Sequence, residues 1–197
     1  MNINRQIFFD SYRSAFGKIR SNNKVANINI MLDSLVRYSH LLNPATPIEQ
    51  LAYIAATVHH ETGARYSAFK EVRQRVAITK RQKYIRRLQD RYWYTGYYGR
   101  GPVQLTWKRN YQWAQRTTGA PLVANPNLLL EDPYLGYEVT IKGMVEGAYT
   151  GKSLSNYINK SKIDYVNARR IVNGKDKAAK IAQYAIKFET IFRRSVV

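Results

Sequence analysis

Two glutamates, Glu61 and Glu71, have the residue type and the setting for acid/base chemistry. Glu61 follows two histidines at the end of an apolar pattern with helical spacing, which would hold its carboxyl group rigidly. Glu71 lies in a segment without helical spacing and is one of only two acids between residues 65 and 116. Two carboxylates on separate elements are what acid/base hydrolysis of a glycosidic bond requires. Surface ion pairs with Arg65 and Arg73 would explain these two residues equally well.

Residues 97–111 combine glycines, aromatic rings and neutral hydrogen-bonding groups within a short stretch. Gly99 and Gly101 permit close approach of the backbone to a ligand, and Pro102 fixes a turn. The neutral polar side chains, which suit sugar hydroxyls, acetamido groups or an attacking water, are Gln104, Thr106 and Asn110. The tyrosine and tryptophan faces suit pyranose rings. The same residues would also fit a core turn in which the aromatic rings only pack together.

These two regions together resemble glycoside hydrolase family 19, which includes chitinases and the endolysins of many phages of Gram-negative bacteria. The similarity rests on His60-Glu61-Thr62-Gly63, on Tyr98-Gly99-Arg100-Gly101-Pro102-Val103-Gln104-Leu105-Thr106-Trp107 and on Asn110-Tyr111. A later segment, Ile171-Val172-Asn173-Gly174, is similar to the Ile-Asn-Gly sequence of the family. The resemblance spans about residues 45–192, which is most of the chain.

The resemblance implies a lysozyme-like helical fold with two lobes around a central cleft, and inverting hydrolysis of a β-1,4 bond between N-acetylated sugars. By position in the motifs, Glu61 is expected to be the general acid, Glu71 the general base and Thr106 the residue that helps to hold the attacking water. The positions expected to bind substrate are His60, Tyr98, Arg100, Gln104, Trp107, Asn110 and Asn173. No cofactor or metal is expected.

Hydrophobic spacing predicts that mainly α-helices position these motifs. The predicted helices cover about residues 7–16, 24–42, 47–63, 79–91, 107–118, 133–149 and 177–194, with at most a short β-hairpin within 92–105. Thr46-Pro47-Ile48-Glu49 has the sequence of a capping box, and Thr106 can cap the helix after it. Because no linker, repeat or separate cell-wall-binding module is evident, we predict one catalytic domain over residues 1–197.

The chain is strongly basic. Its 197 residues include 32 Lys and Arg against 13 Asp and Glu, a net charge of +19, and residues 65–116 alone hold 14 basic and 2 acidic residues. Such a surface favours an anionic polymer as partner, although lysines and arginines on a solvated helix face need none. The lack of cysteine excludes disulfides and thiol catalysis, and His40, His59 and His60 do not have metal-ligand spacing.

The preferred prediction is a lysozyme-type endolysin that cleaves the glycan strands of peptidoglycan for host cell lysis. Peptidoglycan carries the carboxylates of its lactyl-peptides, and the short basic segment 65–95 lacks the longer loops and disulfides of plant chitinases. A chitinase of the same family is the first alternative, although uncharged chitin gives no reason for the basic segment. A nucleic-acid-binding protein is the alternative from another class, but no helix-turn-helix, RNA-binding or zinc signature is present. A lytic transglycosylase, which needs one glutamate and no base, is a further variant.

The sequence contains no recognisable targeting or membrane-spanning segment. Residues 1–10 lack a signal-peptide pattern, and no apolar stretch is long enough to cross a bilayer. An endolysin of this kind is expected to be a monomer that stays in the host bacterial cytoplasm. A separate membrane-permeabilising protein would then release it to the periplasm and cell wall. There its basic patches are expected to contact the anionic outer-membrane or cell-wall surface, and no nucleic-acid partner is expected.

Overall fold

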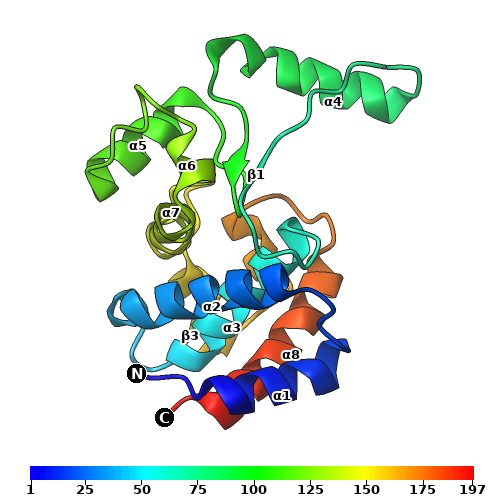
Figure 1. Cartoon of the computed structure of the whole chain (residues 1–197). Coiled ribbons are helices and arrows are strands. Elements are labelled where there is room, and N and C mark those ends of the chain that lie inside the picture. The colour runs from blue at the N-terminus through cyan, green and yellow to red at the C-terminus, as the bar shows by residue number, and fades with distance from the viewer.

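The computed structural model describes residues 1–197 and is built mainly from helices, as predicted (Figure 1). The eight α-helices are α1 (Arg5–Phe16), α2 (Asn22–Arg37), α3 (Pro47–Glu61), α4 (Lys80–Asp90), α5 (Lys108–Thr118), α6 (Leu128–Glu131), α7 (Pro133–Glu146) and α8 (Ala178–Ser195). The 3-10 helices are η1 (Ser39–Leu41), η2 (Trp93–Thr95), η3 (Leu154–Asn156) and η4 (Asn167–Ile171). Two short antiparallel pairs join β1 (Phe69–Lys70) to β2 (Arg100–Gly101) and β3 (Ile158–Asn159) to β4 (Lys162–Ile163). None of the helices is both long enough and apolar enough to cross a membrane.

The helices form two lobes with separate hydrophobic cores (Figure 1). The large lobe consists mainly of α1, α2, α3 and α8, and its core holds 32 buried residues. The small lobe contains α5 and α6, and its core consists of Leu105, Tyr111, Ala114, Leu122, Leu129 and Val139. Helix α7 joins the lobes because it contributes Tyr137 and Met144 to the large core and Val139 to the small one. The predicted lysozyme-like arrangement of two lobes is therefore confirmed.

Helix α3 runs through the centre of the large lobe and packs along α8. Every residue from Gln50 to His59 is buried, so this helix contacts protein on all sides. Pro47 stands in its first turn, where a backbone N–H has no helical partner to lose. The helix ends at Glu61, and Gly63 reverses the chain with a φ of +57°, which favours glycine. Glu61 therefore lies at the rigid end of a buried helix, as predicted.

Residues 70–98 form an arm that projects from the rest of the molecule (Figure 1). At its base Phe69 pairs with Gly101 and Lys70 pairs with Arg100. The arm carries the predicted basic helix α4, whose exposed basic side chains are Lys80, Arg81, Lys83, Arg86 and Arg87. No residue of α4 belongs to either hydrophobic core, so polar contacts and the β1–β2 pair set the place of the arm.

The capping box predicted before α3 is absent. The Thr46 side chain makes no capping hydrogen bond, and its hydroxyl donates instead to the carbonyl of Ile158 over 3.4 Å. Glu49, the expected partner of Thr46, pairs with Arg193 of α8. Both side chains are thus used by tertiary contacts, which a local pattern does not reveal.

The short strands also differ from the predicted hairpin. Within residues 92–105 only an isolated bridge joins Arg100 and Leu105, and β2 pairs with β1 from outside that range. The β3–β4 hairpin had no sequence signal, because strands of two residues are too short to show alternation. Helix α2 ends at Arg37 rather than near residue 42, and η1 follows it.

A buried polar network links α1, α3 and the loop after α3. His59 Nδ1 lies 2.6 Å from the Tyr66 hydroxyl, which donates to the Tyr12 hydroxyl over 3.0 Å. The His59 ring also packs against Phe16 and Tyr184, with ring centroids 4.7 and 4.6 Å away. Burial, with smaller contributions from nearby positive charges, lowers the pKa of His59 from 6.5 to about 4.

We expect the free energy of unfolding to fall as the pH is lowered from about 7 to about 4. The unfolded chain binds a proton at His59 below about pH 6.5, whereas the folded protein does not do so until about pH 4. The difference corresponds to about 3 kcal/mol of stability, which is complete above pH 6.5 and lost on acidification. Urea denaturation at a series of pH values measures this loss. His59→Phe keeps the aromatic packing and should flatten the profile, whereas an equal slope in the variant would assign the pH dependence to other groups, such as His60 or carboxylates.

Candidate active site

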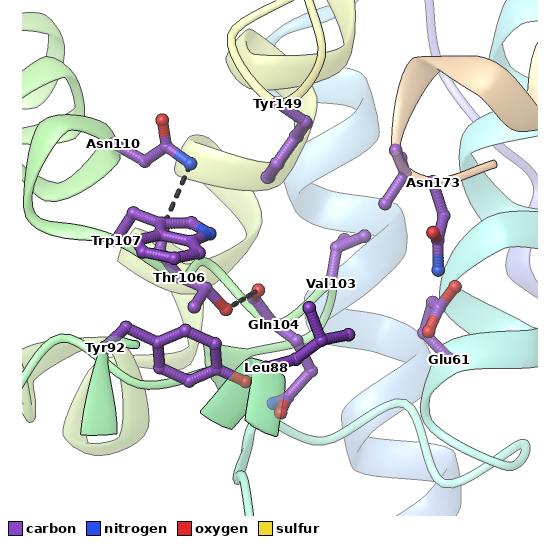
Figure 2. A pocket seen from close by; sticks show the side chains of 11 residues that line it. Glu61, Leu88, Tyr92, Val103, Gln104, Thr106, Trp107, Asn110, Tyr149 and Asn173 are labelled. Atoms are coloured by element: carbon purple, nitrogen blue, oxygen red, sulfur yellow. Dashed lines mark hydrogen bonds between the residues drawn. The ribbon is translucent and has the colours of Figure 1, made fainter. Parts of the chain in front are cut away.

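The two lobes face each other across a cavity of about 350 Å³ (Figure 2). Its lining consists of Glu61, Leu88, Tyr92, Val103, Gln104, Thr106, Trp107, Asn110, Tyr149, Val172 and Asn173. Glu61 and Asn173 belong to the large-lobe side, and Thr106, Trp107 and Asn110 lie opposite them (Figure 2). The cavity therefore has a carboxylate on one wall and neutral hydrogen-bonding and aromatic groups on the other.

Most residues singled out from the sequence meet in this cavity, although they are up to 112 positions apart. Those in the lining are Glu61, Gln104, Thr106, Trp107, Asn110 and Asn173. Those outside it are His60, Glu71, Tyr98 and Arg100. No cluster of three or more His, Cys, Asp or Glu side chains that could hold a metal is present.

The Glu61 carboxylate is held by an arginine that the sequence analysis did not single out. Arg169 Nη1 donates to Glu61 Oε1 over 2.5 Å, and Arg169 Nε donates to the Asp176 carbonyl over 3.1 Å. The Arg169 side chain is only 4% exposed, so its guanidinium is fixed by the surrounding protein. Glu61 Oε2 makes no hydrogen bond within the protein and is left for a ligand. Among the 32 Lys and Arg of this chain, no sequence signal distinguished Arg169.

Glu71 lies behind the opposite wall and is anchored by three hydrogen bonds. Gln89 Nε2 and the Tyr92 hydroxyl donate to Glu71 Oε1 over 2.9 and 2.7 Å, and the Gly99 N–H donates to Oε2 over 2.8 Å. Burial raises the pKa of Tyr92, and its hydrogen bond to Glu71 raises it further, so Tyr92 stays a neutral donor. Since Tyr92 lines the cavity, the Glu71 carboxylate is one hydrogen bond away from the lining.

Gly99 is the point at which Glu71 and Gln104 approach the same backbone. A Cβ atom at this position would lie 2.6 Å from Gln104 Oε1 and 3.2 Å from Glu71 Oε2. The other polar atom of the Gln104 amide is also held, because Nε2 donates to the Phe69 carbonyl over 2.7 Å. A larger residue here would therefore displace the side chains of two candidate site residues.

The segment 104–110 presents its side chains through an unusual backbone. Gln104 and Trp107 have φ values of +56° and +74°, which are uncommon for residues other than glycine and occur often at functional sites. The Thr106 hydroxyl donates to the Gln104 carbonyl over 3.0 Å, and Asn110 Nδ2 donates to the Thr106 carbonyl over 2.8 Å (Figure 2). Trp107 is the residue before α5, so the predicted role of Thr106 as its cap is wrong.

Arg100 belongs to the scaffold of this wall rather than to the cavity. Its side chain is buried, its Nε donates to Asn127 Oδ1 over 2.9 Å, and its Nη1 donates to the carbonyls of Gly96 and Tyr98. The guanidinium carbon lies 3.8 Å from the centroid of the Tyr98 ring. The prediction that Arg100 contacts substrate is therefore replaced by a role in holding Tyr98 and its loop. His60 is partly buried outside the lining, and burial lowers its pKa.

Comparison with known proteins assigns the family. The profile of glycoside hydrolase family 19, described as chitinase class I, matches residues 45–158. The chain belongs to glycoside hydrolase family 19. The match includes Glu61, Glu71 and the whole 97–111 segment, whereas Arg169 and Asn173 lie beyond its limit.

Family 19 relatives resemble parts of this chain in sequence and most of it in fold. Chitinase 11 of Oryza sativa is 51% identical over 45 residues, which is 23% of this chain and 18% of that protein. This chain thus matches less than a fifth of that relative's length. Chitinase C of Streptomyces griseus has a similar structure, with a TM-score of 0.59 and 22% identity over 93% of this chain and 74% of that one. A class IV family 19 chitinase of Zea mays superposes with a TM-score of 0.55 and 17% identity, covering 92% and 90% of the two chains.

We expect Gly99→Ala to reduce hydrolytic activity more than it reduces stability. The new methyl group would displace Gln104 and Glu71, and a misplacement of about 1 Å at a catalytic group can lower turnover roughly 100-fold. Gly174→Ala is the matched control, because a Cβ atom there meets nothing within 4 Å. Turnover and the melting temperature of both variants are the measurements. Full activity of Gly99→Ala would show that the positions of Gln104 and Glu71 do not matter.

Proposed function

We propose that the chain hydrolyses β-1,4 bonds between N-acetylated sugars, using Glu61 as general acid. This proposal rests on the chemistry of the two facing walls of the cavity. A carboxylate fixed by Arg169 faces the amide, hydroxyl and indole groups of the 104–110 segment. Membership of family 19 supports the same chemistry.

In the proposed mechanism, Glu61 protonates the glycosidic oxygen and Glu71 activates water. Glu61 Oε2 has no protein partner, so we assign it the proton that the leaving oxygen takes up. Glu71 accepts a proton from a water that attacks the opposite face of the sugar, and Thr106 and Gln104 help to hold this water. Inverting enzymes separate their two carboxyl groups by about 6.5–9.5 Å to leave room for water. Glu71 lies behind Tyr92 and outside the cavity lining, so in this mechanism the attacking water must come within reach of Glu71 beside Tyr92.

The remaining lining groups suit N-acetylated pyranose rings. The rings of Trp107 and Tyr92 meet edge to face, with centroids 5.0 Å apart, and offer apolar surface to a sugar ring. The side-chain amides of Asn110 and Asn173 are donors and acceptors from opposite walls. We assign them the acetamido and hydroxyl groups of the two sugars that flank the scissile bond.

Two polymers contain such a bond, and each is favoured by a separate observation. The relatives reported above are named as chitinases, which favours chitin. The net charge of +19, concentrated around the arm, favours peptidoglycan, because chitin is uncharged. The finer role of a phage endolysin rests on the charge and the compact sequence alone. A nucleic-acid-binding function is not proposed, since the chain belongs to a family of glycoside hydrolases.

Hydrolysis of both polymers side by side tests the proposal. A chitin oligosaccharide and purified peptidoglycan sacculi are digested, and mass spectrometry of the products identifies the new reducing end. Proton NMR of the first product from a β bond should show the α anomer, as inversion requires. The absence of products from both polymers would refute the proposed function. A 1,6-anhydro product would instead identify a lytic transglycosylase and leave Glu71 without a catalytic task.

Glu61→Gln and Glu71→Gln should each lower turnover by roughly 100- to 10,000-fold, because a positioned acid or base contributes about that much to the rate. Both substitutions keep the side-chain shape and replace the proton-transferring oxygen. Glu131→Gln is the control, because Glu131 is exposed on α6 and forms no ion pair. Initial rates on a soluble glycan are the measurement. Retention of more than about a tenth of wild-type activity by either variant would remove that residue from the mechanism.

Thr106→Val should lower turnover strongly while the melting temperature changes little. The substitution is nearly isosteric and removes the hydroxyl that faces the cavity. Thr190→Val is matched to it, because the Thr190 hydroxyl also donates to a backbone carbonyl but lies exposed on α8. Thermal unfolding and initial rates are compared for the two variants. Lost stability with full activity in Thr106→Val would mean that the hydroxyl serves only its own loop.

A further inference from the structure

A second groove opens on the arm next to Glu71. It has a volume of about 690 Å³ and is lined by Lys70, Glu71, Val72, Arg73, Gln74, Arg75, Val76 and Trp93. Three of these residues are cationic, and Glu71 is the sole acid. Three donors of the protein already hydrogen-bond the Glu71 carboxylate, so its negative charge in the groove is partly offset. The groove is therefore a positively charged surface of the arm.

Two of the three cations have no ionic partner. Arg73 pairs with Asp90 over 2.6 Å. Lys70 and Arg75 are exposed and form no ion pair with any carboxylate of the protein. Their charges are thus free to meet an anionic ligand that enters the groove.

Trp93, which lines the groove, belongs to a pair of stacked rings. Trp93 and Tyr98 stack with centroids 4.5 Å apart and an interplanar angle of 19°. The buried Arg100 lies against the Tyr98 ring, and Lys70 Nζ lies 5.1 Å from its centroid. Arg73 lies 6.0 Å from the Trp93 ring. Cations over aromatic faces are attracted by the ring quadrupole, so Lys70 and Arg73 are pre-positioned.

The groove and the candidate active site share one wall. Glu71 belongs to the lining of the groove, and Tyr92, which donates to it over 2.7 Å, belongs to the lining of the cavity. A substituent on a sugar in the cavity therefore has a short way to travel to the groove. A peptide of four extended residues reaches about 13 Å, which is enough to pass Tyr92 and enter the groove.

We infer that this groove binds the carboxylates of the peptide stems that branch from peptidoglycan strands. The inference rests on the proposed glycoside hydrolase function and selects its substrate class. Chitin has no charged branches, so a basic groove beside its cleavage site would have no ligand. A stem peptide carries carboxylates at its side chains and its end, and these match Lys70 and Arg75. The groove thereby favours glycan strands with peptide branches over bare strands of the same sugars.

The double variant Lys70→Gln, Arg75→Gln tests this inference, with Lys152→Gln, Lys160→Gln as the matched control. Both variants lose two exposed positive charges, but the control pair lies in the loop after α7 and in the β3–β4 turn. Each protein digests soluble peptidoglycan strands with intact stems and the same strands stripped of stems by an amidase. We expect the KM of the groove variant for intact strands to rise about five- to tenfold, as two exposed ion pairs would give. Its kcat, and both constants on stripped strands, should stay close to wild type.

Binding is measured separately so that it does not depend on turnover. Isothermal titration calorimetry of Glu61→Gln with disaccharide-tetrapeptide dimers should give tighter binding than with dimers that lack the peptide. The groove substitutions in that background should abolish the difference. The inference would be overturned if the groove variant lost affinity equally for intact and stripped strands, or lost none for either. An equal loss of affinity in the control variant would also overturn it. If wild type releases no reducing ends from either strand, the proposed function fails, and the calorimetry still decides whether the groove prefers stems.

Discussion

The complete burial of α3 fixes one wall of the candidate active site. Ten consecutive residues, Gln50 to His59, are enclosed by the large core, so the helix cannot shift without disturbing close-packed neighbours. Glu61 is the last residue of the helix, two positions after His59, and it lines the cavity from this fixed place. Arg169, buried on η4, then holds one of its two carboxylate oxygens. Packing thus determines where the carboxyl group lies, and a single ion pair determines which oxygen is free.

The opposite wall of the cavity is held in place mainly by polar contacts rather than by a buried helix. The arm that carries α4 contributes no buried residue to the hydrophobic cores, and apart from Tyr97, which packs against the small core, it is attached mainly by polar contacts. Glu71 is central among these contacts, because it joins Gln89 and Tyr92 of the arm to the backbone of Gly99. A carboxylate proposed to act in catalysis therefore also fixes the segment that presents Gln104 and Thr106. Loss of this side chain affects both the base and the wall around it.

The charge of the chain is the feature that distinguishes the two proposed substrates, which share one type of bond. The chemistry proposed for the cavity uses neutral side chains around a carboxylate and would suit chitin and peptidoglycan alike. The features that differ are outside the cavity: the exposed basic face of α4 and the groove that contains Lys70 and Arg75. Discrimination between the polymers would then come from their substituents, since only peptidoglycan presents carboxylates along the strand. Under the proposals made above, bond cleavage and recognition of the polymer are assigned to neighbouring but distinct surfaces.

The sequence by itself determined the helical class, the place of Glu61 at the C-terminal end of α3, the basic helix and the 97–111 segment, because each depends on local spacing and residue type. The resemblance to the family indicated in addition that Glu61, Gln104, Thr106, Trp107, Asn110 and Asn173 belong to one site, and they line one cavity. Tertiary structure alone decided the partners of charged and polar side chains. Glu49 pairs with Arg193 instead of taking part in the expected capping box. Arg100 is buried against the Tyr98 ring, and Arg169 pairs with Glu61. The partner of a charged or polar side chain depends on which groups lie near it in the folded protein. Glu61 and Arg169 are 108 positions apart, so no local sequence pattern could show that they pair.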